Sequence, residues 1–390
     1  MAHTFIMPGL ILSGGGAVEQ SMDYMPKPPE KALVVTSACN VEYGQVDEIT
    51  EVLEKEGREY CIFDQVNQEP SDRMVQAGAR LYMEEHCGYL IAIGGGSAID
   101  VMKAIGLLVS NPGDITDYAG KKEVLNPLPF MAAVPTTAGT GSEATQFTII
   151  TDTKRNVKML IGMKELMPDL VLLIPKLTYT VPKEVTVSTG MDALIHAVEA
   201  FLSKKAQPLT DSLAISAVKR ILPNLPLVYS DGTDQSARNE MACAALEAGI
   251  AFNNSSVTLI HGMSRPIGAL FHVPHGLSNA MLLRECMYFM ADSAEDRLAV
   301  LSEAVHAAEN GMNEKEKTEA LLKKMSELCD FCVVPTLEEY GVEKEAFMAQ
   351  IDKMAEDALA SGSPQNLRKT IGKEDIISIY QKLWQEERSS

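Results

Sequence analysis

Roughly the first 180 residues alternate short runs of β-branched and apolar residues with amphipathic segments, and this alternation constrains the fold more than any other feature of the chain. Apolar residues at helical spacing predict helices over residues 44–56, 72–86 and 98–109. The runs between them predict strands over residues 32–36, 60–63, 89–93 and 130–134, with further strands over 145–150, 158–161 and 170–174. Strands that alternate with helices in this way predict a parallel sheet with helices on both faces.

The pattern changes after Pro182, where strand-like runs end and long helical patterns follow. Helices are expected over residues 189–201, 209–222, 237–252, 295–308, 315–328 and 344–360. We therefore expect two domains, an α/β domain over residues 1–181 and an all-helical domain over residues 182–390. A chain of 390 residues is long enough for both domains to bury sizeable cores.

Charge and cysteine content limit the partners and the compartment of the protein. Lys and Arg number 34 against 53 Asp and Glu, and the formal net charge of −19 argues against binding to nucleic acid or to an anionic membrane surface. The seven Cys are odd in number and scattered, which indicates reduced thiols and a cytoplasmic enzyme. The sequence shows neither a signal peptide nor an apolar run of the roughly 18 residues that a membrane helix needs.

A segment that reads as a buried helix, residues 187–201, carries candidate metal ligands. Asp192 and His196 lie four residues apart and so share one face, among residues that are nearly all apolar. Their burial requires a strong partner. A metal ion is one such partner, and the alternatives are an ion pair between the two or capped polar residues near the start of a helix. Glycines and prolines in residues 259–279 suggest a turn, and this segment holds His261, His272 and His275. Two of these would complete a set of one carboxylate and three imidazoles, which suits Fe(II), Zn(II), Co(II) or Ni(II).

Two small loops at the ends of predicted strands are candidates for a nucleotide site. The first precedes a helix, whose N-terminus favours a phosphate, and consists of Gly94, Gly95, Gly96 and Ser97. The second offers the hydroxyl groups of Thr136, Thr137, Thr140 and Ser142. Ligands of parallel sheets bind at the carboxyl ends of the strands, so the two loops together indicate a nucleotide. A tight turn without a ligand and a solvated loop are the alternatives.

Four motifs together resemble those of the iron-containing (group III) alcohol dehydrogenases, in the same order and spacing: GGGSAID, PTTAGTGSEAT, STGMDALIHAVEAF and HGMSRPIGALFHVPHG. The resemblance implies an N-terminal α/β domain that binds a dinucleotide, an all-α C-terminal domain that binds a metal, and an active site in the cleft between them. Dehydroquinate synthase shares this architecture. The resemblance also implies a homo-oligomer, a dimer or larger.

Motif by motif, the resemblance implies site residues in both domains. The metal ligands fall on Asp192, His196, His261 and His275. The pyrophosphate loop falls on Gly94, Gly95, Gly96 and Ser97, and further cofactor positions fall on Ser37, Asp100, Thr136, Thr137, Thr140, Lys158 and Leu177. The implied metal is Fe²⁺, with Zn²⁺ as the alternative because the same ligands accept both. The implied dinucleotide is NAD or NADP.

The chain departs from the family pattern at three places. Many members carry a His where this chain has Arg265, which cannot shuttle a proton because its pKa stays above about 12. We expect Arg265 to pair with an anionic group of the substrate, or to form a salt bridge at the edge of the cleft or at a subunit interface. Ser37 stands where NAD-preferring members often have an acidic residue, and its neutral side chain permits NADP. Glu69 lies in Gln68–Glu69–Pro70, where relatives commonly read Pro-Asn-Pro, and its negative charge would disfavour the extra phosphate of NADP. His272 is a candidate proton relay, and a structural role is the alternative.

The expected reaction is reversible hydride transfer between the nicotinamide and a small alcohol or aldehyde, with the metal as Lewis acid. The expected partners are a small-molecule substrate and further copies of the chain, without nucleic acid or membrane. The alternatives are a glycerol dehydrogenase-like enzyme, a dehydroquinate synthase-like enzyme, and a catalytically silent nucleotide or metal sensor. A phosphate-bearing substrate would require several Lys and Arg, and only Lys158 and Arg265 lie near the motifs.

Overall fold

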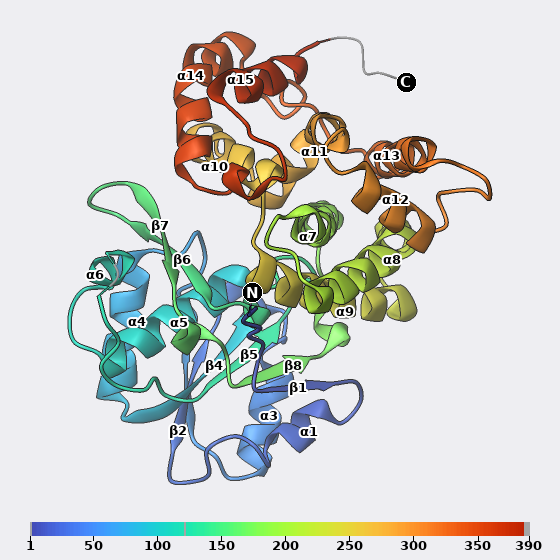
Figure 1. Cartoon of the computed structure of the whole chain (residues 1–390). Coiled ribbons are helices and arrows are strands. Elements are labelled where there is room, and N and C mark those ends of the chain that lie inside the picture. The colour runs from blue at the N-terminus through green and yellow to red at the C-terminus, as the bar shows by residue number, and fades with distance from the viewer. Residues whose placement is uncertain (1, 121, 386–390) are drawn as a thin grey trace. The chain divides into compact units, whose positions relative to one another are not determined.

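The computed structural model describes residues 2–120 and 122–385, which form two compact units (Figure 1). One unit comprises residues 6–180, and the other comprises residues 181–385 together with residues 2–5. The N-terminal residues are tied to the second unit by a hydrogen bond from Gln207 Nε2 to the carbonyl oxygen of Thr4, at 3.1 Å. The chain therefore passes from the first unit to the second between Thr180 and Val181.

The first unit is built around a six-stranded sheet in which each described pair of neighbouring strands is parallel. From edge to edge the strands are β1 (Leu10–Ser13), β8 (Leu170–Leu173), β5 (Met131–Pro135), β4 (Cys87–Gly94), β2 (Lys31–Val35) and β3 (Tyr60–Phe63). After β2 the chain adds β3 on one side and then β4, β5 and β8 on the other. The strand order thus reverses between β2 and β4, and ligands of open α/β sheets bind at such a point.

Apolar residues of the central strands face the two sides of the sheet alternately, as the pleat requires. The helices of this unit are α1 (Ala17–Ser21), α2 (Ala38–Glu42), α3 (Asp47–Lys55), α4 (Asp72–Glu84), α5 (Gly96–Ser110) and α6 (Ile115–Ala119). Leu33 and Val35 of β2 pack in one core with residues of α4 and α5. Ala32 and Val34 pack in the other core with residues of α1 and α3. Helices on both faces of a parallel sheet are therefore confirmed (Figure 1).

Two predicted strands lie outside this sheet. They are β6 (Phe147–Asp152) and β7 (Val157–Gly162), which form a separate antiparallel pair. The edge strand β1 and the short helices α1, α2 and α6 are not among the predicted elements. Each is only four or five residues long, which is too short for a periodic apolar pattern.

The second unit contains helices and no strand among its described residues. They are α7 (Lys183–Leu202), α8 (Pro208–Ser230), α9 (Gln235–Ser255), α10 (Leu259–Phe271), α11 (His275–Ala291), α12 (Glu295–Ala304), α13 (Glu314–Phe331), α14 (Lys344–Ala360) and α15 (Lys373–Lys382), with a short 3₁₀ helix η4 (Pro364–Asn366). Helix α7 packs against α8, α9 and α11. It is long and apolar enough to cross a membrane, but 83% of its apolar window is buried within the protein, as expected of a core helix.

Helix α8 is longer than the sequence predicts. The predicted end is Leu222, but the helix continues through Pro223 and Pro226 to its end eight residues later. Beyond the predicted end, Leu225 and Val228 are buried. Their packing outweighs the hydrogen bonds that the two prolines remove from the helix.

Candidate metal centre and cofactor loops

Helices α7, α10 and α11 bring the predicted metal ligands together. Asp192 and His196 lie one turn apart on α7, His261 lies in the first turn of α10, and His275 is the first residue of α11. The turn predicted from the glycines and prolines is confined to residues 272–274, between α10 and α11. One side-chain donor atom from each of Asp192, His261 and His275 lies within 4.8 Å of the others.

The geometry of the cluster centres on the Asp192 carboxylate. Its Oδ1 lies 3.4 Å from Nε2 of His261 and 3.8 Å from Nε2 of His275. The Nδ1 of His196 lies 3.8 Å from Asp192 Oδ2, and the His196 ring stacks on Phe252 and on His261, with centroids 4.1 and 4.3 Å apart. His275 is exposed, whereas the other three predicted ligands are buried. The structure thus brings Asp192, His261 and His275 together and places His196 beside them, next to Asp192 and stacked on His261.

Glu199, which the sequence reasoning did not single out, orients His261. Its buried carboxylate lies 2.6 Å from Nδ1 of His261. A carboxylate only accepts, so His261 donates from Nδ1 and leaves the Nε2 lone pair available to a metal. The same carboxylate accepts from the backbone N–H groups of Thr258, Ile260 and His261 and so caps α10. The available signal was a Glu one turn after His196 on an otherwise apolar helix.

Asn279 lies among the acceptor atoms, and its contacts show that the cluster suits a cation. Its Nδ2 lies 2.7 Å from Asp192 Oδ1, 3.2 Å from His261 Nε2 and 3.3 Å from His275 Nε2. An amide has only two hydrogens for these three acceptors. The Nδ1 of His196 is buried without a hydrogen-bond partner among the described residues. One carboxylate and three imidazoles with too few donors fit a divalent transition metal.

Burial and mutual contact shift the pKa values of these groups. Burial lowers the pKa of His196 to about 3, and Asp192 offsets this only in part, so the ring is neutral, as metal binding requires. Burial raises the pKa of Asp192, but the nearby imidazoles outweigh it and hold that pKa well below its usual range. Burial also opposes ionisation of Glu199, but the hydrogen bond from His261 outweighs it and lowers the pKa. Two ionised carboxylates are thus buried together, and a cation would balance their charge.

In the first unit, the two predicted loops leave the carboxyl ends of neighbouring strands. Gly94 at the end of β4 is paired with Pro135 at the end of β5, and the N–H of Thr136 donates to the carbonyl oxygen of Gly94 at 3.0 Å. Gly95 is the N-cap of α5 and provides no side-chain cap, and Ser97 lies in the first turn. Uncapped N–H groups at the start of a helix are the feature that binds a phosphate.

The hydroxyl-rich loop packs directly on the glycine run. A Cβ atom at Gly96 would lie 2.8 Å from Oγ1 of Thr140, and one at Gly95 would lie 3.3 Å from Oγ1 of Thr137. A larger residue at Gly96 would therefore displace Thr140. The close approach explains why both loops are built from small residues, and it places the predicted cofactor hydroxyls beside the start of α5.

Lys103 of α5 is fully buried and holds the hydroxyl-rich loop in place. Its Nζ donates to the carbonyl oxygens of Ser142, Thr145 and Phe147 at 2.6, 2.7 and 2.9 Å. Asp100, one turn earlier, accepts from the Ser142 hydroxyl at 2.5 Å and from a backbone N–H of β6 at 2.9 Å. Both Asp100 oxygens are thus engaged in supporting this loop, and a direct contact of Asp100 with the cofactor stays a prediction.

Three further predicted cofactor residues lie elsewhere in the first unit. Ser37 follows β2 and caps α2 by accepting from the N–H of Asn40 at 3.3 Å. Lys158 on β7 forms an exposed ion pair with Glu69, with 2.6 Å between Nζ and Oε1. Leu177 is buried in the core that α1 and α3 cover. Their contacts with a dinucleotide stay predictions.

Arg265 and His272, the predicted catalytic residues, belong to α10 and its C-terminal end. Arg265 follows His261 by one turn, is half-buried, and donates from Nη1 to Ser363 Oγ at 3.2 Å. Burial lowers the pKa of its guanidinium, and Glu199 offsets this in part. His272 is the exposed C-cap of α10, with a left-handed φ of 55°. Its role as a proton relay stays a prediction.

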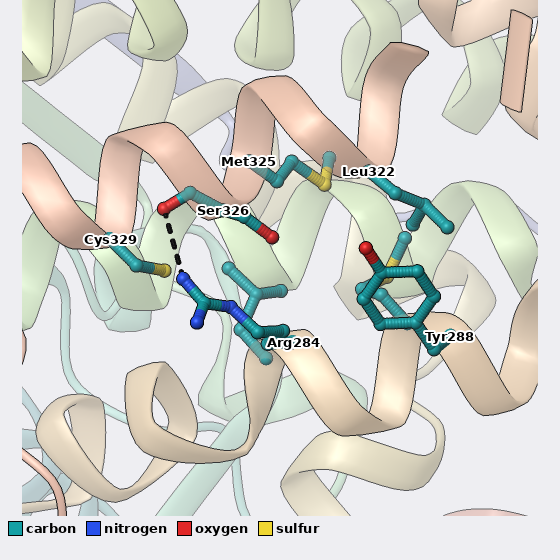
Figure 2. Close-up of a pocket in the computed structure, with 8 residues that line it drawn as sticks. Arg284, Tyr288, Leu322, Met325, Ser326 and Cys329 are labelled. Atoms are coloured by element: carbon teal, nitrogen blue, oxygen red, sulfur yellow. Dashed lines mark hydrogen bonds between the residues drawn. The ribbon is translucent and has the colours of Figure 1, made fainter. Parts of the chain in front are cut away.

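A cavity of about 10 Å³ lies elsewhere in the helical unit, between α11 and α13 (Figure 2). Tyr288 and Met325 contribute to its walls, and Arg284 donates there to the carbonyl oxygen of Ser326 at 3.4 Å. Arg284 also pairs with Asp330 at 2.9 Å. A space of this size holds about one water molecule, so it is not a substrate site.

Both units match family models. The model described as "Iron-containing alcohol dehydrogenase" matches residues 8–175, and the model described as "Fe-containing alcohol dehydrogenase family, C-terminal" matches residues 186–384. Among curated proteins, choline dehydrogenase of Bacillus subtilis (strain 168) is 34% identical over 371 residues, which are 94% of this chain and 92% of that protein. The similarity therefore extends through both units.

Solved structures share the fold over nearly the whole chain. A 1,3-propanediol oxidoreductase superposes with a TM-score of 0.93 at 32% identity, covering 98% of this chain and 100% of that one. Sulfoacetaldehyde reductase from Bifidobacterium kashiwanohense, in complex with NAD⁺, superposes with a TM-score of 0.88 at 27% identity, covering 99% and 100%. These matches confirm the expected family, fold class and reaction type. The chain belongs to the iron-containing alcohol dehydrogenase family of metal-dependent, NAD-linked oxidoreductases.

Proposed function

We propose that this protein interconverts small alcohols and aldehydes with NAD(H) or NADP(H), at a metal ion held by Asp192, His196, His261 and His275. One observation carries the proposal: donor atoms of Asp192, His261 and His275 converge from α7, α10 and α11, with His196 next to Asp192, and Glu199 holds His261 in the tautomer that presents Nε2. When bound, a divalent metal supplies Lewis acidity to the oxygen of the substrate. Fe²⁺ is the proposed ion, and Zn²⁺ is the alternative that the same ligands accept.

The residues around the cluster prepare it for both ion and substrate. The Asp192 carboxylate offsets part of the charge of the ion, and the neutral His196 ring is held by stacking on Phe252. His275 is the exposed member of the cluster, and we propose that the substrate approaches on its side. Asn279, whose amide already contacts three ligand atoms, would turn to accommodate the ion.

We propose that the loops of the first unit hold the dinucleotide. The N-terminus of α5 and the run Gly94–Gly96 suit its pyrophosphate, because N–H groups and close backbone approach are both available there. Lys103 supports this site by fixing the loop that carries Thr136, Thr137 and Thr140. A dinucleotide held there would supply or accept the hydride of the proposed reaction.

The substrates in the names of the relatives differ in charge, so they do not identify the substrate of this chain. Choline is a cation, 1,3-propanediol is neutral, and sulfoacetaldehyde is an anion. Selectivity must therefore come from side chains of this chain near the metal centre. Preference between NADH and NADPH likewise depends on local groups, and we assign it to Ser37 and to the Glu69–Lys158 pair.

We further propose that the enzyme works as an aldehyde reductase in the cytoplasm and assembles as a homodimer or larger oligomer. The oligomer is what the resemblance to the family implies, and seven free thiols support a reducing compartment. Light scattering coupled to size-exclusion chromatography measures the mass of the assembly. A mass equal to that of a single chain would contradict the proposed oligomer.

Metal dependence tests the proposed function. Protein stripped of metal and reloaded anaerobically with Fe(II) or Zn(II) is given NADH or NADPH and short aldehydes, and loss of the reduced cofactor is followed. Reloading should restore turnover, and Asp192→Asn should lower both turnover and the amount of bound metal. Asp330→Asn, which removes a carboxylate paired with Arg284 instead, is the matched control. Full turnover by metal-free protein would contradict the proposal.

A further inference from the structure

Arg265 lacks the carboxylate partner that four other arginines of the helical unit have. Those four each pair with a carboxylate, and they are Arg220, Arg284, Arg297 and Arg368. Between residues 2 and 385, residue 121 excepted, no carboxylate lies within ion-pair distance of Arg265. Among the described residues, the guanidinium donates only to a neutral hydroxyl, that of Ser363. A half-buried guanidinium without an anion beside it is poised to bind one.

Arg265 lies beside the metal centre. It follows the ligand His261 by four residues on α10, so the two side chains share one face of the helix. Four residues of α-helix rise by about 6 Å. Glu199, which binds His261, also contributes to the electrostatic environment of the guanidinium. An anion bound by Arg265 would therefore lie within the length of a small molecule from the metal site.

Ser363 is a fixed second donor at this place. The residue is buried and immediately precedes η4, whose Asn366 donates to the Ser256 hydroxyl and to the carbonyl oxygen of Val257, both at 3.0 Å. Gly262 permits the close approach, because a Cβ there would lie 2.7 Å from the Pro364 ring. The Ser363 oxygen accepts from Arg265, so its own hydrogen is left to donate to a ligand.

We propose that Arg265 and Ser363 bind the oxyanion of a short aldehyde or alcohol, a carboxylate or sulfonate, whose reacting oxygen is held at the metal centre one turn away. The proposal rests on the dehydrogenase function proposed above. The spacing suits an anion separated from the reacting carbon by about one or two further carbon atoms. Arg265 acts here as a specificity residue, since a guanidinium cannot relay protons.

Pairs of aldehydes matched in size test the proposal. The holoenzyme is assayed with 4-oxobutanoate against butanal and with sulfoacetaldehyde against propanal. The wild type should favour the anionic member by roughly ten- to one-hundred-fold in kcat/KM, mainly through KM. Arg265→Met should abolish this preference and Arg265→Lys should retain part of it, because a point charge replaces the fork. Ser363→Ala should raise KM for the anionic aldehydes alone.

Two controls separate binding of the substrate from other roles of Arg265. Arg284→Met removes an arginine that already has a carboxylate partner, and it should leave the preference unchanged. Methanesulfonate and succinate should inhibit butanal reduction by the wild type competitively and should inhibit Arg265→Lys more weakly. This second readout needs no activity with anionic aldehydes, and it remains available if Arg265→Met fails to fold.

The outcomes distinguish this inference from the proposed function. Equal turnover of anionic and neutral aldehydes by the wild type would overturn the role of Arg265 and leave the dehydrogenase in place. A second result would also overturn this role: in Arg265→Met, the KM for NADH rises by the same factor with anionic and neutral aldehydes. Arg265 would then bind a phosphate of the cofactor and not the substrate. Absence of turnover with every aldehyde would instead count against the dehydrogenase function itself.

Discussion

Replacing Glu199 with Gln tests the group that couples the start of α10 to the metal centre. The carboxylate accepts five hydrogen bonds, from the N–H groups of Thr258, Ile260 and His261, from the Thr258 hydroxyl and from His261 Nδ1. Gln keeps the shape of the side chain but has one acceptor oxygen. Its amide nitrogen can only donate, so it cannot satisfy the donors that surround the second oxygen.

This mismatch disturbs a different group in each orientation of the amide, either His261 or the start of α10. In Glu199, Oε1 faces the Ile260 N–H at 2.6 Å and Oε2 faces His261 Nδ1 at 2.6 Å. If the amide oxygen faces Ile260, the amide nitrogen donates to Nδ1, the imidazole proton moves to Nε2, and the lone pair for the metal is lost. If the amide is reversed, its NH₂ group opposes the N–H of Ile260, and α10 loses that hydrogen bond, while the amide oxygen still accepts from the N–H groups of Thr258 and His261.

The losses of stability and of metal affinity in Glu199→Gln can both be estimated. Breaking a buried, charged network by removing one partner costs about 3–5 kcal/mol, and each hydrogen bond to a charged acceptor contributes about 1.5–3 kcal/mol. We therefore expect Glu199→Gln to lower the free energy of unfolding of metal-free protein by about 3–5 kcal/mol. Loss of the partner of a metal-binding His typically weakens metal binding by roughly 10–100-fold, and we expect the same here.

Two assays measure these effects. Urea denaturation of metal-free protein gives the free energy of unfolding, and titration with Co(II) against a chelator, followed by visible absorption, gives the affinity and the coordination of the ion. Thr258→Val is the matched control, since it removes one donor to Glu199 without touching His261. It should cost about 1 kcal/mol of stability and leave Co(II) binding unchanged. Wild-type affinity and spectrum in Glu199→Gln would refute the assigned role.

Three further changes probe the α/β unit. Burial raises the pKa of Glu143 to about 7, although Lys103 opposes the shift. The protonated side chain therefore stabilises the fold at low pH, and this contribution is lost as the pH rises through that value. Between about pH 5 and 8, urea titrations should show the free energy of unfolding of the wild type falling on the order of 3 kcal/mol further than that of Glu143→Gln. Lys103→Met should release three carbonyl groups of the hydroxyl-rich loop and weaken NADH binding roughly tenfold by fluorescence titration, with Co(II) affinity unchanged. Glu69→Gln should free Lys158 and raise the ratio of kcat/KM for NADPH over NADH by up to about fivefold; an unchanged ratio would remove this pair from cofactor selection.

The elements of the α/β unit could be predicted because their signals are local. The predicted strand over residues 60–63 coincides with β3, and the predicted helix over 72–86 begins with α4 at Asp72. That helix start is encoded by Ser71, whose side chain accepts from the Met74 N–H, and by apolar residues at helical spacing. A cap and a periodic stripe need only a few neighbouring residues, so no knowledge of the rest of the fold is required.

The contacts that complete the metal centre could not be predicted, because they join segments that only the fold brings together. Glu199 meets Thr258, which is 59 residues later, and Asn279 meets Asp192, which is 87 residues earlier. Sequence spacing identified the ligands themselves only where two lie on one helix. Helix α10 was also hard to predict, because Pro266 and the nearby glycines are residues that seldom occur inside a helix.

The location of the ion is the decisive test of the proposed metal site. Crystals grown anaerobically with Fe(II) would be measured for anomalous scattering at the iron absorption edge. We expect a single strong peak at about 2.0–2.2 Å from side-chain donor atoms of Asp192, His196, His261 and His275. A peak bound by other residues, or no peak in protein that contains stoichiometric iron and reduces aldehydes, would contradict it.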